Sequence, residues 1–148
     1  MGTVKVEITL KNLSDVSLAN YGHITEADVH AETVEAVVDT GAMTLVINEK
    51  LREKLALKVT ERKFVRVADG SRVECVLTEP VEICWKDRSA VQKAVVLPNA
   101  PVILLGVTPL EIMDLMVDPV RLELTGAHGD EWTEWLYGHS FIDNHPSV

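Results

Sequence analysis

The stretch that decides the fold reads Ala36-Val37-Val38-Asp39-Thr40-Gly41-Ala42. An aspartate at the end of an apolar strand is costly unless its carboxylate is hydrogen-bonded or opens onto a cleft, because burial penalises an unpaired charge. Gly41 lets the backbone pass close to a neighbouring group. These residues alone leave two interpretations open. Asp39 is either a structural carboxylate that binds loop amides or a catalytic carboxylate at a cleft.

Short runs of apolar residues, several of them alternating with polar ones, surround this stretch and indicate strands. Residues 12–31 are weakly patterned and are expected to form a long surface connection, with or without a short helical turn. Many short strands and two short helices predict a mostly-β, closed or nearly closed sheet. The expected strands cover residues 4–10, 33–38, 45–47, 64–67, 73–77, 81–85, 91–97, 103–106 and 120–124.

Local signals place the two helices and one hairpin. Asn48 can cap a helix over residues 49–57. Thr108-Pro109-Leu110-Glu111 reads as a capping box, which predicts a short helix that runs to about Met116. Between these helices, Asp69-Gly70 separates two strand-like runs, a pattern typical of a β-hairpin turn.

The order of these elements resembles the retropepsin-like aspartic proteases. In that family the catalytic aspartate lies in an Asp-Thr/Ser-Gly loop, a hairpin flap follows it, and an apolar-apolar-glycine element packs beneath the loop and leads into a short helix. The resemblance covers residues 1–125 and implies a closed acid-protease β-barrel. The matching positions are Asp39, Thr40, Gly41 and Ala42 in the loop, Ala68, Asp69 and Gly70 in the flap, and Leu104, Leu105 and Gly106 beneath the loop.

Peptide hydrolysis without a metal or a covalent step needs a general base and a general acid together, because water is a poor nucleophile. Two close carboxylates can fill both roles by sharing one proton. The chain carries one such motif, since Asp69-Gly70-Ser71 lacks an apolar pair before its aspartate. A second copy of the chain is therefore expected to supply the other Asp39, in a homodimer with the site on a two-fold axis.

The resemblance implies the same homodimer and a peptide or protein substrate. It also implies that Thr40 bonds across the axis and that the Gly41 carbonyl binds substrate. Met43 and Thr44 stand where the viral enzymes carry acidic residues, and residues 48–57 are longer and helix-like, so the chain looks more like the bacterial and archaeal single-domain relatives. The predicted function is an aspartic endopeptidase. The alternative is a non-catalytic peptide- or protein-binding module on the same fold.

Other candidate chemistries are weaker. Cys75 alternates with Val73 and Leu77, a pattern that favours a small core residue over a nucleophile. His128 and the histidines at 139 and 145 match no helical or hairpin ligand spacing, so neither a metal nor another cofactor is expected.

Composition sets the remaining limits. The chain has 148 residues, which suits one domain, and 14 basic against 23 acidic residues give a formal net charge of -9. That balance disfavours a nucleic-acid partner. Two cysteines make no disulfide framework, no signal peptide is evident, and the longest uncharged run is broken by prolines. We therefore expect a cytoplasmic protein without a membrane segment.

Residues 126–148 form an acidic, aromatic tail beyond the family-like elements. Arg121 is the last basic residue of the chain, whereas Trp132, Trp135 and Tyr137 follow in the tail. Trp132, Trp135 and Leu136 have helical spacing, which suggests that the tail packs against the domain or against a partner copy.

Overall fold

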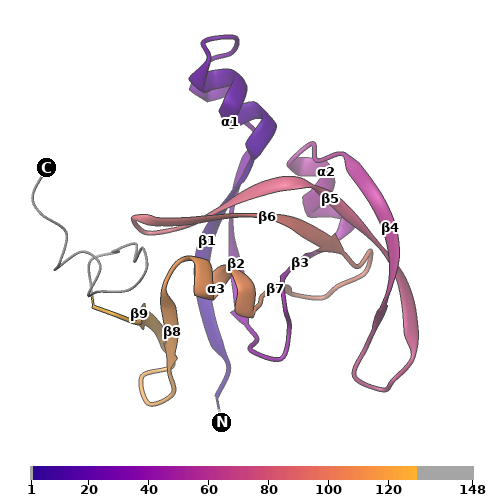
Figure 1. The fold of residues 1–148 in the computed structure, drawn as a ribbon, viewed down its shortest axis with the longest axis vertical. Helices are drawn as coiled ribbons and strands as arrows, with labels where there is room; N and C mark the ends of the chain where they lie inside the picture. The colour runs from indigo at the N-terminus through magenta and orange to yellow at the C-terminus, as the bar shows by residue number, and fades with distance from the viewer. Residues whose placement is uncertain (1, 130–148) are drawn as a thin grey trace, which may run out of the picture.

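The computed structural model describes residues 2–129 (Figure 1). The predicted tail beyond Gly129 lies outside the described residues. The strands are β1 (Val4–Asn12), β2 (Ala31–Val38), β3 (Leu45–Ile47), β4 (Val59–Arg66), β5 (Arg72–Trp85), β6 (Arg88–Val96), β7 (Ile103–Leu105), β8 (Leu115–Asp118) and β9 (Glu123–Gly126). The helices are α1 (Leu13–Asn20), the 3-10 helix η1 (Glu26–Asp28), α2 (Glu49–Lys54) and α3 (Val107–Ile112).

The main sheet closes on itself. Its strands run in the order β1-β2-β7-β3-β6-β5-β4, and β1 pairs again with β5, from Thr9 opposite Cys84 to Asn12 opposite Val81. The strands β1, β2, β7, β3, β6 and β5 thus form a closed barrel, and β4 stays outside as the outer strand of the β4–β5 hairpin. The predicted mostly-β closed barrel is confirmed. β8 and β9 form a separate two-stranded sheet.

The barrel interior follows from the alternation of apolar residues along its strands. In β1 the side chains of Ile8 and Leu10 are fully buried, whereas Lys5 and Glu7 face outward. Helix α2 covers the core with Leu51, and Leu55 directly after it is also buried. Burial of each such side chain contributes about 1.5–3 kcal/mol. This core fixes the strands that carry the candidate site.

The sequence predicted two short helices, but the structure contains three α-helices within residues 2–129. The connection over residues 12–31 contains α1, which begins where the Asn12 side chain accepts a hydrogen bond from the Asp15 amide. The side-chain Nδ2 of Asn12 also donates to the carbonyl oxygens of Leu55 and Ala56, which ties the base of α1 to the end of α2. No helix within residues 2–129 is long and apolar enough to cross a membrane.

The chain after β7 also differs from the expectation. Helix α3 begins one residue before the predicted capping Thr108 and ends at Ile112, because Asp114 adopts a positive φ of 54° that stops the helix. The predicted end at Met116 falls within strand β8. The last strand begins at Glu123 rather than at Val120, since residues 119–122 form the β8–β9 turn.

Residues 72–85 form one long strand, where the sequence predicts two. The register of β5 against β6 shifts between Leu77 and Pro80, which is a bulge that tolerates a proline. The buried Thr78 hydroxyl satisfies the backbone there, because it accepts from the Ala94 amide and donates to the Glu79 carbonyl. The first half of β5 thereby leaves the barrel and pairs with β4.

Candidate active site

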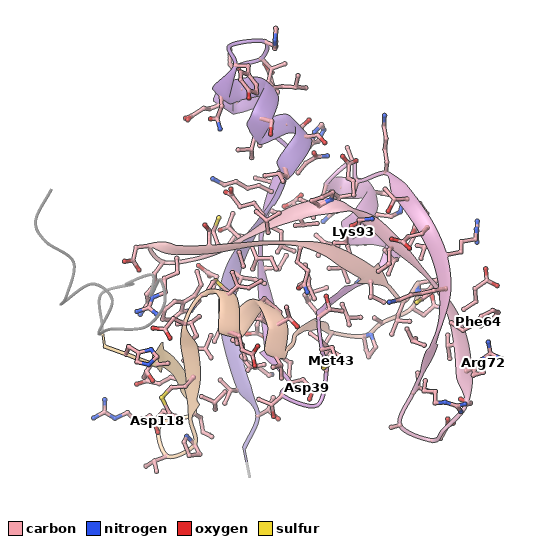
Figure 2. All side chains as sticks on the ribbon, in the orientation of Figure 1. Asp39, Met43, Phe64, Arg72, Lys93 and Asp118 are labelled. Carbon is pink, nitrogen blue, oxygen red and sulfur yellow. The ribbon has the colours of Figure 1, made fainter. Side chains whose placement is uncertain are left out.

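Asp39 lies directly after β2, on the loop that leads to β3. The loop starts from the parallel pair of strands β2 and β7, and the Asp39 amide extends that ladder by donating to the Leu105 carbonyl at 3.0 Å. The Ala42 amide donates to the Asp39 carbonyl at 3.0 Å, and the Gly41 amide donates to the Asp39 carboxylate oxygen Oδ1 at 2.8 Å. The loop backbone therefore orients a half-buried carboxylate toward the end of the molecule shown at the bottom of Figure 2.

The loop rests on the element that begins with Gly106. The amides of Gly106, Val107 and Thr108 donate to the carbonyls of Thr44, Ala42 and Met43 at 2.9–3.1 Å. A Cβ built on Gly106 would lie 2.6 Å from the Ala42 oxygen and 2.6 Å from the Thr44 nitrogen and oxygen. The two backbones are in contact, and only glycine fits between them.

This close contact also explains how α3 begins. Its Ncap residue Gly106 makes no side-chain hydrogen bond, because the carbonyls of the Asp39 loop already accept from the first amides of the helix. The capping-box pattern predicted a helix that begins near Thr108. The helix α3 does begin there, but the loop carbonyls bind its first amides and the Thr108 side chain does not cap it. The structure brings together the loop residues 39–42 and the predicted supporting residues 104–106.

The predicted flap residues form the turn of the β4–β5 hairpin. The Gly70 amide donates to the Val67 carbonyl at 2.9 Å, the Val67 amide donates to the Ser71 carbonyl at 3.0 Å, and Gly70 has a φ of 86°. This is a three-residue hairpin loop that requires glycine at its last position. Ala68, Asp69 and Gly70 are exposed, and the structure places them at the hairpin tip rather than against the Asp39 loop.

The Asp69 carboxylate stabilises this turn when it is ionised. The hydroxyl and the amide of Ser71 both donate to Asp69 Oδ1, and these bonds lower the pKa of the carboxyl below its usual 3.8. Because the folded-state pKa is lowered, the ionised carboxylate contributes fully to folding stability above pH 3.8. That stabilisation is lost only as the pH falls through the lower folded-state pKa.

We expect the Ser71 amide resonance, followed by NMR while the barrel remains folded, to titrate with a midpoint below 3.8. Ser71→Ala removes the hydroxyl donor and should move that midpoint upward. Asp69→Asn should abolish the titration. A wild-type midpoint at or above 3.8 would contradict the hydrogen-bonding account.

An apolar surface lies between the hairpin and the barrel strands that flank the loop. Val46, Cys75 and Val95 form a small buried cluster separate from the main core, with Val65, Leu77, Leu97 and Leu104 packed around it. On the loop itself Met43 is 70% exposed, and Figure 2 shows it beside Asp39. One exposed apolar side chain therefore lies beside the Asp39 carboxylate.

The two thiols are not poised for nucleophilic chemistry. Cys75 is buried in the small apolar cluster, and that burial raises the pKa of its thiol. Burial, with a smaller effect from the hydrogen bond to Glu82, raises the pKa of the Cys84 thiol to about 11. Neither thiol is ionised near neutral pH.

Metal ligation has no candidate in the part of the chain that the structure describes. No group of three or more His, Cys, Asp or Glu side chains there could hold an ion. The His128 ring nitrogen lies 2.7 Å from the Asp114 carboxylate in an exposed pair. The histidines at 139 and 145 fall beyond the described residues.

One buried residue was missed by the sequence interpretation. The expected strands 81–85 and 91–97 leave Arg88 between them, but Arg88 begins β6 and is only 2% exposed. Its guanidinium donates to the carbonyls of Met113, Asp114 and Gly129 at 2.7–2.9 Å. Arg88 therefore binds the carbonyls that follow α3 and fixes the start of the β8–β9 hairpin.

A closed β-barrel with an Asp-Thr-Gly loop, braced by an apolar-apolar-glycine element, defines the acid-protease class of fold. A family model described as "gag-polyprotein putative aspartyl protease" matches residues 25–111, which is more than half of the chain, and the chain belongs to that family. A solved structure of EIAV protease in complex with the inhibitor HBY-793 is similar, with 26% identity and a TM-score of 0.44. That match covers 53% of this chain and 75% of the viral chain. A comparison with curated proteins gives no match.

Proposed function

We propose that the protein is an aspartic endopeptidase that acts as a homodimer, with one Asp39 from each copy activating a water molecule. The observation that carries the proposal is the oriented carboxylate of Asp39, which the Gly41 amide holds at the end of β2. Membership in an aspartyl protease family supports the same chemistry. The described chain provides this loop once, so a two-carboxylate site requires a second copy.

In the proposed reaction the two Asp39 carboxyls share one proton. The ionised carboxylate removes a proton from water as the water oxygen attacks the peptide carbonyl carbon, while the protonated carboxyl donates its proton to the carbonyl oxygen. The resulting gem-diol collapses as the carbon–nitrogen bond breaks. The amine leaves with the proton that the first carboxylate took, and the second carboxyl recovers its own proton from a diol hydroxyl.

The proposed substrate is a peptide in an extended conformation with apolar side chains near the scissile bond. The exposed Met43 and the half-buried Val65 and Leu77 that cover the small cluster would contact those side chains. Met43 and Thr44 stand where the viral relatives carry acidic residues, and on that ground we propose that the chain is of the bacterial and archaeal single-domain type. The two free thiols support our proposal of a reducing, cytoplasmic location.

A non-catalytic peptide-binding module is the second candidate. The observation that favours it is that one described copy presents a single Asp39 loop, which could bind a peptide beside its apolar cluster without hydrolysing it. Such a module would bind a statine peptide, a mimic of the gem-diol, but would cleave no peptide at any protein concentration.

The test combines cleavage of a denatured protein with a protein dilution series, from acid to neutral pH. A site shared by two copies should lose specific activity on dilution, in proportion to the dimer fraction measured by sedimentation velocity. A statine peptide should inhibit the cleavage and shift the equilibrium toward the dimer. Full specific activity in a strictly monomeric sample would contradict the shared site, and binding without cleavage would favour the module.

A further inference from the structure

The β8–β9 hairpin carries an unusual concentration of exposed apolar side chains. Val120 is 88% exposed, Met116 50% and Leu122 38%, all within seven residues of sequence. The opposite face of the same hairpin is anchored in the main core by Leu115 and Leu124, which are buried. The hairpin is therefore fixed to the barrel while its tip presents apolar surface to solvent.

The tip is held in one conformation by its own hydrogen bonds. Asp118 Oδ1 accepts from the amides of Val120 and Arg121 at 2.9 and 3.0 Å, and the Leu122 amide donates to the Asp118 carbonyl at 2.9 Å. A preorganised tip loses little conformational entropy when another surface covers it. Its charges nearly cancel, since Asp118 and Glu123 oppose Arg121, so two such tips repel each other only weakly.

Backbone pairing and packing connect this tip to the candidate active site. Val4 in β1 pairs with Val38, the residue before Asp39. Gly2, roughly 7 Å of extended chain earlier, lies against Leu122, because a Cβ on Gly2 would be 2.6 Å from Leu122 Cδ1. In Figure 1 the β8–β9 turn, the N-terminus, the Asp39 loop and the β4–β5 turn all lie along the lower edge. Figure 2 labels Asp118 and Asp39 at that edge.

We propose that the β8–β9 tip is the surface through which two copies of this chain associate and bring their Asp39 loops together. The inference rests on the proposed function, because a site with one carboxylate per chain is incomplete until a second copy approaches at the end that carries Asp39. Around a two-fold axis the same apolar tip serves both copies. Helix α1 also exposes Leu18 and Tyr21, but it projects from the opposite end in Figure 1 and cannot complete the site.

The test places a charge on the tip and measures association directly. Val120→Asp and Val120→Lys should each raise the dimer dissociation constant at least tenfold in sedimentation velocity, because either charge must be desolvated in the interface. Both substitutions leave the isolated fold intact, since Val120 is 88% exposed, and far-UV circular dichroism checks this. Tyr21→Asp is the matched control at an 80% exposed residue, and it should leave the dissociation constant unchanged.

Sedimentation separates this inference from the proposed function. If Asp39→Asn still cleaves, the proposed function fails, while the association result stands by itself. If both Val120 variants associate as tightly as the parent, the tip is not the interface. A truncation after Gly129 that alone dissociates the dimer, with the Val120 variants unaffected, would assign the interface to the tail and overturn the inference.

Discussion

Replacing Asp39 by asparagine is expected to abolish peptide cleavage, with a loss of at least about 1,000-fold in kcat/KM. Loss of one general acid or base typically costs 10²–10⁴-fold, and in a symmetric dimer the single substitution removes both groups. The asparagine side chain has almost the same shape, and its oxygen can still accept the Gly41 amide that binds Asp39 Oδ1. Stability and association should therefore change little, and the loss should appear in turnover.

Mixing experiments sharpen this prediction. Excess Asp39→Asn chain should inactivate the wild type as copies exchange, because a mixed dimer retains only one carboxylate. Asp87→Asn, which changes an exposed aspartate in the β5–β6 turn, is the charge-matched control and should neither lose activity nor inhibit the wild type. Unchanged cleavage by Asp39→Asn, or mixed samples whose activity simply equals the wild-type fraction, would refute the shared catalytic pair.

The sequence predicted the barrel well because its strands follow a strong physical rule. Residues that face the barrel interior must be apolar, so the alternation in β1 and the apolar run before Asp39 identify those strands directly. The hairpin at Asp69-Gly70 was predictable because its turn requires a left-handed residue, and Gly70 has a φ of 86°. The position of Gly106 beneath the loop followed from the resemblance and not from any local rule.

The elements that were mispredicted depend on contacts distant in sequence. Helix α1 buries none of its residues, so the sequence shows no helical periodicity there. Arg88 looks like a turn residue, and only the folded chain brings carbonyls from residues 113, 114 and 129 to its guanidinium. The strand β8 was predicted as the end of a helix, because its pairing with β9 is a contact that the local sequence does not show.

Replacing Gly106 by alanine is expected to cause the largest loss of stability of any conservative change in the site. Gly106 has φ -90° and ψ -171°, a conformation that alanine also adopts, so the penalty comes from contact alone. The new methyl would lie 2.6 Å from atoms of Ala42 and Thr44, all of them backbone atoms that cannot rotate away. Overpacking costs about 1–3 kcal/mol, and each amide bond that the displaced loop loses adds about 1 kcal/mol.

We therefore expect Gly106→Ala to lower the free energy of unfolding by roughly 3 kcal/mol and Tm by about 10 °C. Gly22→Ala is the informative control, because Gly22 has a φ of 79° with no atom near its Cβ, so the variant reports backbone strain without a clash. It should cost about 1 kcal/mol. Below its Tm, Gly106→Ala should still lose most of its cleavage activity, since the methyl displaces the loop that orients Asp39. A variant that melts within about 2 °C of the parent and cleaves normally would show that the loop does not need this contact.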